Sequence, residues 1–374
     1  MDCIISTFST DDTARIFDAL FKSRGLECYR LMTSDIPSFS FSNIDVGEDF
    51  CISIKDDFST LNLVEAIPST FWLRRLAPPK YRHMTLHPDD HGFVGAMNRA
   101  YLSSLMGFLT ELYGQHRVTW VNPLSASRRA ESKISQLYAA KKLGFKVPET
   151  LFSNDYQSVK QRIVDGAWVR KDFLPYTWSV SESTKPIGNY TSNICIGDLP
   201  DGDASRSYIG IFQRRVAKQY ELRVTVIGDY VHAIAIHSQA RPELADDWRA
   251  GDVHPSDVEE VELDETLAER CRAIVRYYDL KYACMDVVFT ASGEHVFLDL
   301  NQMGQFLWVD ELDENSFLME AFFQLLVSGN VGADWRPPAR PVHMREIVEG
   351  TVFRELYEQD LQRPILSFPE DFFG

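Results

Sequence analysis

Hydrophobic positions in the last third of the chain follow the pattern of a β-hairpin. Residues 284–290 and 295–300 are two runs rich in β-branched and aromatic side chains, each of a length typical of a strand. Ser292 and Gly293 lie between the runs and suit a tight two-residue turn. The pattern therefore predicts two antiparallel strands joined at these residues.

A turn at these two positions brings three oxygen-bearing side chains together. Asp286 then faces Asp299 directly, and Asn301 lies on the same face as Asp299 because side chains alternate along a strand. Facing carboxylates repel each other unless a cation lies between them, and hard oxygen donors suit Mg²⁺ shared with substrate phosphates. We interpret the three residues as a Mg²⁺–nucleotide site; the alternative is a hairpin with two acids facing solvent.

The N-terminal residues alternate between apolar runs and a helical pattern. Residues 3–8 form a short apolar strand, and a helix capped at Ser9 or Thr10 leads to a second strand at 28–32. A β-α-β unit of this kind predicts a parallel sheet. Residues 33–60 show no clear period and remain unplaced.

Two cations end the next apolar run, which covers residues 71–75. Arg74 and Arg75 are either a pair that faces a substrate or the solvated end of a strand, and the second interpretation is favoured. Apolar residues at spacings of three and four from Phe93 to Leu112 then predict a long helix that packs one face inward.

Two lysines occupy the elements that follow. A helix is expected over residues 127–143, with Ile134, Leu137 and Tyr138 on its buried face and Lys133 near its start. Lys171 lies among apolar neighbours in a strand, where an ammonium group needs a counter-charge or a ligand.

Strands return in the second half of the chain. A mobile polar loop is expected at residues 174–207, and strands are expected at 208–216, 221–227 and 230–237. A final amphipathic helix around Val352 either docks on the body or meets a partner.

The composition excludes several classes of protein. The chain has 374 residues, 45% of them hydrophobic, which suits two or three subdomains. Its formal net charge of −16 argues against nucleic-acid binding, because phosphate backbones are held chiefly by Lys and Arg. No run of about 18 apolar residues occurs, so we expect no membrane span. The six cysteines form no CxxC pair, which argues against a disulfide framework and for a cytoplasmic location.

Taken in order, these signals resemble the ATP-grasp ligases. A helix lysine, a strand lysine, a Gln-x-x-Val segment, a Glu-x-Arg strand and an acidic hairpin follow one another. More narrowly, four segments are similar to the ATP-grasp ribosomal peptide maturases that make microviridin-type graspetides: FWLRR, WVNPLSASRRAESKISQLYAAKKLGFKVPETLFSND, FQRRVAKQYELRVTVIGDYVHAIAIHSQ with the following DDWR, and MDVVFTASGEHVFLDLNQMGQFLWVDE. The resemblance leaves out the tail after residue 330.

The resemblance implies a mixed α/β and α+β chain with the ATP-grasp fold. It also implies an N-terminal Rossmann-like pre-ATP-grasp domain, a central and a C-terminal ATP-grasp subdomain, and a C-terminal extension. The expected boundaries of these four regions are residues 1–120, 121–205, 206–330 and 331–374.

The resemblance further implies roles for individual residues. Lys133 and Lys171 would reach the ATP phosphates, and Arg223 would contact the γ-phosphate and the acyl phosphate made from it. The metal ligands it implies, Asp286, Asp299 and Asn301, agree with the hairpin prediction. The adenine hinge and the ribose contact would be formed by Gln213, Arg214, Val216 and Glu221.

The activity implied is an ATP- and Mg²⁺-dependent macrocyclase. It would phosphorylate Asp or Glu side chains of a ribosomal precursor peptide, guided by a leader segment, and join them to Ser or Thr hydroxyls or Lys amines. We also expect a homodimer. Two alternatives stay open: a ligase that adds a free amino acid to a carboxylate, and a silent peptide-binding paralogue, because Asp299 stands where Glu is more usual.

Overall fold

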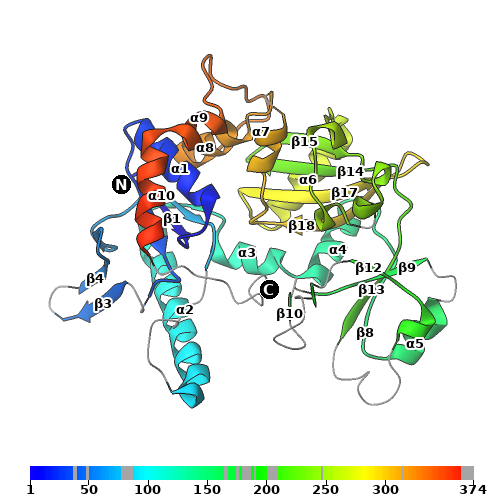
Figure 1. The fold of residues 1–374 in the computed structure, drawn as a ribbon, viewed down its shortest axis with the longest axis horizontal. Helices are drawn as coiled ribbons and strands as arrows, with labels where there is room; N and C mark the ends of the chain where they lie inside the picture. The colour runs from blue at the N-terminus through cyan, green and yellow to red at the C-terminus, as the bar shows by residue number, and fades with distance from the viewer. Residues whose placement is uncertain are drawn as a thin grey trace.

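The computed structural model arranges the chain in three groups of elements (Figure 1). It describes residues 1–36, 40–47, 50–76, 87–163, 167–173, 177–178, 187–188, 191–199, 209–245, 247–313 and 315–363. One group holds the N-terminus together with the C-terminal helices, a second holds a five-stranded sheet, and a third holds a smaller four-stranded sheet. None of the described helices is long and apolar enough to cross a membrane.

A four-stranded parallel sheet forms the centre of the N-terminal group. Its strand order is β2-β1-β6-β7, and each neighbouring pair is parallel, which confirms the predicted β-α-β start. The side chain of Asp11 caps α1, so the prediction of a cap at Ser9 or Thr10 was wrong. The elements are β1 (Cys3–Thr7), α1 (Asp12–Ser23), β2 (Cys28–Met32), β6 (Thr70–Leu73) and β7 (Thr119–Val121).

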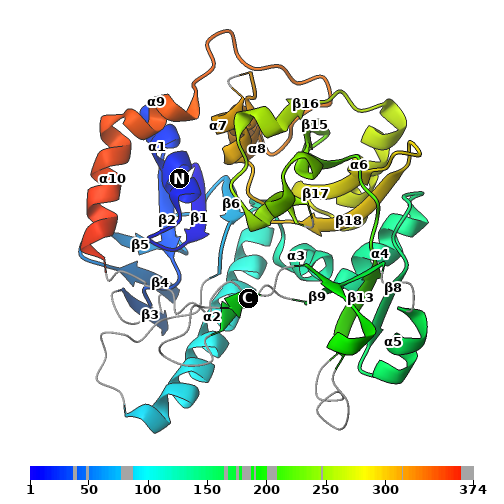
Figure 2. The ribbon, with the colours of Figure 1, turned by 45° about the vertical axis from the view of Figure 1, so that its right-hand side comes forward.

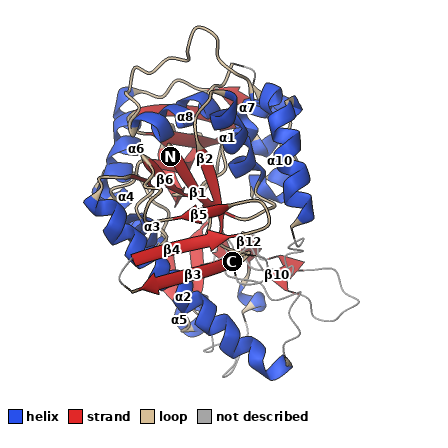
Figure 3. Ribbon diagram, turned by 90° about the vertical axis from the view of Figure 1, so that its left-hand side faces the viewer, coloured by secondary structure: helices blue, strands red, loops and turns tan. Residues whose placement is uncertain are grey.

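The segment left unplaced by its sequence pattern contributes a small antiparallel sheet. It consists of β3 (Phe41–Val46), β4 (Phe50–Lys55) and β5 (Thr60–Asn62). The long helix α2 (His91–Gln115) is present, and Leu105 in its second half is only 2% exposed. The predicted inward face is wrong in the first half, where Phe93 and Met97 are 66% and 50% exposed. These first turns extend beyond the sheets, as Figures 1 and 3 show.

The second group is built on an antiparallel sheet of strand order β16-β15-β14-β17-β18. Alternation places Val224 and Met285 on the face that packs against Ile274 of α6, and it places Arg223 and Asp286 on the opposite face. The elements are β14 (Tyr220–Ile227), β15 (Tyr230–Ile236), β16 (Val258–Glu260), α6 (Glu265–Tyr277), β17 (Tyr282–Phe289), β18 (His295–Asn301), α7 (Leu307–Leu312) and α8 (Leu318–Ser328).

The hairpin β17–β18 is present, and Asp286 pairs with Asp299 as predicted. The turn between the strands differs from the expected two-residue turn. Thr290 donates its N–H to Glu294, and the N–H of Gly293 donates back to Thr290, so three residues form the turn. Gly293 has a φ of 80°, the left-handed conformation that glycine adopts at the end of such a turn.

A β-bulge restores the predicted pairing. The longer turn makes Val287 face Phe297, and this register continued would pair Asp286 with Leu298. The register shifts between Asp286 and Val287, so Leu298 becomes the extra residue of a bulge and Asp286 faces Asp299. The prediction was right at this pair because two departures from regular geometry cancel.

A smaller antiparallel sheet of strand order β12-β9-β13-β8 forms the third group. Its strands and helix confirm the elements predicted around Lys171 and Gln213. The predicted loop at 174–207 lies largely outside the described residues, and its described parts include three short strands. The elements of this group are β8 (Thr150–Ser153), α5 (Tyr156–Arg162), β9 (Trp168–Lys171), β12 (Ser192–Ile194) and β13 (Gly210–Arg214). β10 (Thr177–Trp178) and β11 (Ile187–Gly188) pair with each other in a separate two-stranded sheet.

The helix predicted over residues 127–143 is divided in two. The chain leaves α3 (Leu124–Ala130) at Ala130 and starts α4 (Lys133–Lys142) after Ser132. The Ser132 hydroxyl accepts a hydrogen bond from the N–H of Ser135, which caps α4. Lys133 is therefore the first residue of a new helix.

The predicted buried face of this helix was wrong at two of its three residues, whereas the third, Leu137, packs against the core. Ile134 and Tyr138 are 55% and 64% exposed, whereas Gln136 and Ala139 are buried. The side-chain amide of Gln136 donates to the carbonyl oxygen of Leu300 at 2.8 Å and accepts from its N–H at 3.1 Å. These two bonds fix the face of α4 that carries Gln136 against β18, so Ala139 and Ala140 pack inward while Ile134 and Tyr138 face out.

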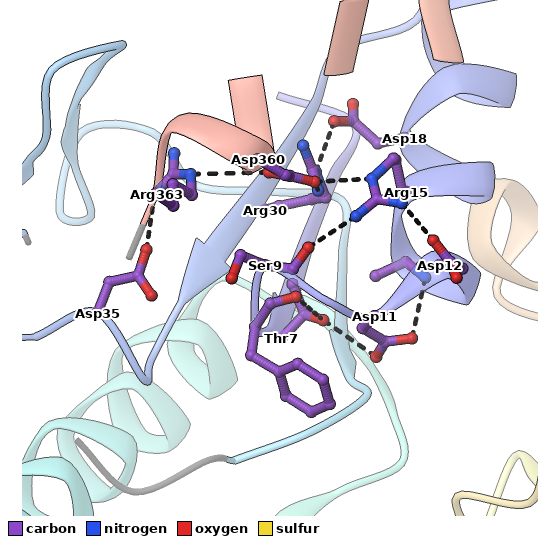
Figure 4. Close-up of polar contacts among 12 residues, drawn as sticks. Thr7, Ser9, Asp11, Asp12, Arg15, Asp18, Arg30, Asp35, Asp360 and Arg363 are labelled. Atoms are coloured by element: carbon purple, nitrogen blue, oxygen red, sulfur yellow. Dashed lines mark hydrogen bonds and ion pairs between the residues drawn. The ribbon is translucent and has the colours of Figure 1, made fainter. Parts of the chain in front are cut away.

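The C-terminal extension docks on the N-terminal group, which decides between the two predicted alternatives. After α9 (Met344–Glu349), helix α10 (Thr351–Gln362) runs along α1 (Figure 2). Asp360 near the end of α10 accepts hydrogen bonds from Arg15 and Arg30 of the N-terminal unit (Figure 4). Beyond it, Arg363 forms ion pairs with Asp35 and Asp56, each at 2.7 Å.

Candidate functional site

A row of three charged side chains crosses neighbouring strands of the five-stranded sheet. Arg223 on β14 pairs with Asp286 on β17, which pairs in turn with Asp299 on β18. Glu221 and Asn301 lie two positions along their strands and so share this face. The structure therefore brings five of the predicted site residues onto one face of one sheet.

Asp286 is the most enclosed member of the row. It is 4% exposed, and its two carboxylate oxygens accept hydrogen bonds from Arg223, at 3.0 Å, and from Arg249. Burial opposes ionisation, but the positive charges of Arg249 and Arg223 outweigh it and lower the pKa of Asp286. The carboxylate is therefore charged at neutral pH and can bind cations.

The two predicted lysines lie near the other carboxylate. Lys133 at the start of α4 forms an ion pair with Asp299. Burial lowers the pKa of Lys171 on β9, and the charges of Asp299 and Asp247 oppose that effect. Asp299 thus lies between a lysine of α4 and a lysine of the small sheet, where a phosphate would meet both.

A tight loop follows β18 and packs on the row. Asn301 accepts a hydrogen bond through its Oδ1 from the N–H of Met303 at 2.9 Å. Arg223 donates its second Nη to the carbonyl of Gln305 at 2.9 Å. A Cβ on Gly304 would lie 2.5 Å from Cβ of Cys284 and 3.0 Å from Nη2 of Arg223. Only glycine allows this approach, so the loop holds the Arg223 guanidinium in position.

A pocket lies where the small sheet meets the five-stranded sheet. The pocket is lined by four of the predicted site residues, which come from the small sheet and the segment after it: Lys171, Gln213, Arg214 and Val216. Its other lining residues are Val169, Thr191, Arg215, Lys218, Val288 and Leu298. Gln213 is 4% exposed and donates to the hydroxyl of Thr150 at 3.0 Å. The residues predicted to form the adenine hinge therefore line one pocket, whose apolar side chains are Val169, Val216, Val288 and Leu298.

Glu221 lies next to this pocket. Its carboxylate accepts from Lys218 at 2.8 Å and from the Ser238 hydroxyl at 2.9 Å. Burial raises the pKa of Glu221, and the charge of Lys218 opposes the shift. The two partners fix the carboxylate beside the pocket wall.

Three residues of the site were quoted in the motif DDWR but were assigned no role. Arg249 contacts Asp286 and Asp247, and its guanidinium lies 5.0 Å from the ring centroid of Trp248. The Trp248 ring is also 5.8 Å from the Arg223 guanidinium. The run Asp-Asp-Trp-Arg between two apolar segments is unusual, and it could have identified these residues as candidates for the site.

The two arginines after β6 are not a solvated strand end, so the favoured interpretation of the sequence was wrong. Arg74 is 2% exposed, and it contacts the carboxylate of Asp11 and the carbonyl of Met303, which lies in the loop after β18. Arg75 is half-buried beside it. The N-terminal sheet thus ends against the loop that carries the candidate site.

The oxygen donors at this site fit Mg²⁺. Asp286, Asp299 and Asn301 offer hard oxygens on one face, and the two carboxylates already attract the cations Arg249 and Lys133. Across the described ranges, no group of three or more His, Cys, Asp and Glu side chains is arranged to hold a metal ion. Binding at this site therefore depends on the amide of Asn301 and on phosphate oxygens, which Mg²⁺ commonly uses.

Comparison with known proteins identifies the fold of this chain. No family model matches the sequence, and no curated protein does. Solved structures do match. A RiPP-associated ATP-grasp ligase from Chryseobacterium gregarium, in complex with ADP and a leader and core peptide, is 23% identical, with a TM-score of 0.77 over 90% of this chain and 100% of that one. The macrocyclase MdnC from Microcystis aeruginosa, bound to the precursor peptide MdnA, is 23% identical, with a TM-score of 0.73 over 87% and 99%.

This chain has the fold of the ATP-grasp ligases. A third structure, the ATP-grasp ligase PsnB complexed with a precursor variant, Mg and ADP, is 19% identical, with a TM-score of 0.65 over 88% of this chain and 98% of that one. The likeness confirms at the level of the fold the resemblance found in the sequence. In this chain the pocket of the candidate site is lined by residues of the small sheet and of the five-stranded sheet.

Proposed function

We propose that this protein is an ATP- and Mg²⁺-dependent ligase that crosslinks a ribosomal precursor peptide. It activates Asp or Glu side chains of the peptide and joins them to Ser or Thr hydroxyls or Lys amines. One observation carries the proposal: Arg223, Asp286 and Asp299 form a row, with the first two buried, beside two lysines and the pocket that the predicted hinge residues line. Neighbours of the same fold are complexes with ADP and precursor peptides, which supports it.

The nucleotide would occupy the pocket and the row together. Gln213, Arg214 and Val216 would contact the adenine, and Glu221 would hold the ribose. Lys133 and Lys171 would contact the phosphates. Burial lowers the pKa of Lys171, so its ammonium group gains stability from a nearby anion. Asp286, Asp299 and Asn301 would hold Mg²⁺, which neutralises charge on the transferred phosphate.

Arg223 would stabilise the peptide carboxylate and the acyl phosphate. The carboxylate oxygen attacks the γ-phosphorus, ADP leaves, and a mixed anhydride remains on the peptide. The hydroxyl or amine then attacks the carbonyl carbon, its proton is released, and phosphate leaves. Two guanidinium groups, those of Arg223 and Arg249, pair with Asp286, and both would stabilise the charge that develops in these steps.

The predicted domain division, homodimer and cytoplasmic location belong to this proposal. The parallel sheet of β2-β1-β6-β7 with α1 supports a Rossmann-like pre-ATP-grasp unit at residues 1–120. The two antiparallel sheets support two ATP-grasp subdomains within the predicted ranges 121–205 and 206–330, but β13 (Gly210–Arg214) belongs to the small sheet, so we place the boundary between them after residue 214. Helices α9 and α10 support an extension from residue 331.

Intact mass measurement tests the reaction. The protein is incubated with ATP, Mg²⁺ and an acidic, Thr- or Lys-rich precursor encoded beside its gene. Each crosslink should remove the mass of one water, and ADP should be released in step with it. A mass gain would instead indicate addition of a free amino acid, and absence of ADP release would indicate a silent peptide-binding protein.

Arg223→Ala separates binding from chemistry. We expect this variant to bind ATP but to form no product, because the guanidinium acts on the charge that develops on the peptide. Arg99→Ala removes the same charge from an exposed position on α2 and should keep full activity. Full activity of Arg223→Ala would remove this residue from the mechanism.

A further inference from the structure

Arg75 lacks a partner for its charge. No hydrogen bond or ion pair joins its guanidinium to another side chain in the part of the chain that the structure describes, although the residue is half-buried. Burial, followed by repulsion from the charge of Arg74, lowers the pKa of Arg75 to about 10. A guanidinium in this situation gains stability from an added anion.

The nearby acid is already engaged. Asp11 accepts hydrogen bonds from Thr7 at 3.0 Å and from the N–H of Ala14, and it forms the ion pair with Arg74 at 3.3 Å. Its carboxylate therefore caps α1 and neutralises Arg74. Two adjacent arginines share one carboxylate, so one positive charge remains for a ligand.

The position of Arg75 is that of a ligand contact. It follows β6, and its backbone N–H donates to the carbonyl of Ser6 near the end of β1, so it lies at the carboxyl edge of the parallel sheet. Ligands of open parallel sheets bind outside this edge. The loop after β18 lies against the same edge, because Arg74 donates to Met303 and Thr13 of α1 donates to Gln305.

That loop separates Arg75 from the nucleotide site. Arg74 holds the loop from the N-terminal side through Met303, and Arg223 holds it from the other side through Gln305. The hydroxyl of Tyr282 on β17 donates to the carbonyl of Gly304 in the same loop. An anion at Arg75 would therefore be a neighbour of the reacting carboxylate rather than that carboxylate or a nucleotide phosphate.

We propose that Arg75 binds a second carboxylate of the acidic peptide substrate while another carboxylate of the same peptide reacts at Arg223. This inference rests on the proposed function and adds a determinant of specificity to it. The planar guanidinium matches a carboxylate through two parallel hydrogen bonds, which a glutamine side chain cannot replace because it carries no charge. The site would favour peptides with several acidic residues.

Fluorescence anisotropy with two labelled peptides tests the inference. One is a ten-residue peptide of alternating Thr and Glu, and the other has Gln in place of every Glu; both are titrated with full-length protein in the presence of ADP and Mg²⁺. Arg75→Ala should weaken binding of the Glu peptide about tenfold and leave binding of the Gln peptide unchanged. Arg75→Lys should lose less affinity for the Glu peptide than Arg75→Ala does. Arg99→Ala should bind both peptides with wild-type affinity.

Each other outcome counts against the inference. Unchanged affinity of Arg75→Ala for the Glu peptide, an equal loss for both peptides, or no binding of the Glu peptide by the wild type would overturn it. Calorimetry of ADP and Mg²⁺ in the same samples separates the two proposals. If ADP binds normally, only the role of Arg75 fails, whereas absence of ADP binding by the wild type removes the proposed function. A change in ADP affinity in Arg75→Ala would assign the guanidinium to the nucleotide phosphates and overturn the inference.

Discussion

Replacing Asp360 with alanine should lower the free energy of unfolding by about 3–5 kcal/mol. Its Oδ2 accepts from Nε of Arg15 at 2.7 Å and from Nη1 of Arg30 at 2.6 Å, and the side chains of Asp360, Arg15 and Arg30 are 4%, 3% and 6% exposed (Figure 4). The substitution removes two charge-assisted hydrogen bonds, each contributing about 1.5–3 kcal/mol. Arg15 keeps Asp12 and Arg30 keeps Asp18, so neither guanidinium loses all its partners.

Urea unfolding followed by tryptophan fluorescence measures this change. Glu358→Ala is the matched control, because it removes the same charge from an exposed position on the same helix and should change stability by less than about 0.5 kcal/mol. Asp360→Asn keeps an acceptor and should lie between the two. Equal stabilities of Asp360→Ala and Glu358→Ala would refute the reasoning that this carboxylate holds α10 to the N-terminal unit.

Two further substitutions test packing and protonation. Gly304→Ala places a Cβ 2.5 Å from Cβ of Cys284, which should lower the free energy of unfolding by about 1–3 kcal/mol. The same Cβ displaces Arg223, so the rate of ADP formation should fall. Wild-type stability and turnover in this variant would contradict the packing. Burial lowers the pKa of His232 to about 4, so protonation below about pH 6.5 favours the unfolded chain. Urea unfolding at pH 7 and pH 5 should show about 2 kcal/mol more loss for the wild type than for His232→Gln. The exposed His116→Gln should behave like the wild type, and an equal loss in all three proteins would contradict the assignment.

The strands of the site could be predicted from sequence because their pattern is local. Apolar runs at 221–227 and 284–290 predicted strands that the structure has at 220–227 and 282–289, and alternation placed Asn301 on the face of Asp299. The pairing of Asp286 with Asp299 was also predicted, although neither the three-residue turn nor the bulge at Leu298 was foreseen. The position of a bulge depends on how both faces of the sheet pack, and a local sequence pattern does not contain that information.

The sequence could not predict features that depend on distant segments. Arg74 was expected at a solvated end because neither Asp11 nor Met303 is near it in sequence. Gln136 was not placed on the predicted buried face of its helix, because its partner, the backbone of Leu300, is 164 positions away. In both cases a polar side chain is buried because remote backbone or charge satisfies it, which reverses the rule that polar residues face solvent.

Calorimetric titration with ADP tests the central claim most directly, namely that Asp286 and Asp299 hold the Mg²⁺ of a bound nucleotide. The wild type should bind ADP more tightly with Mg²⁺ than with EDTA. Asp286→Asn and Asp299→Asn should lose most of that difference, because an amide is a weaker ligand for Mg²⁺ than a carboxylate, while Glu358→Gln should keep it. The same gain from Mg²⁺ in all four proteins would contradict the account.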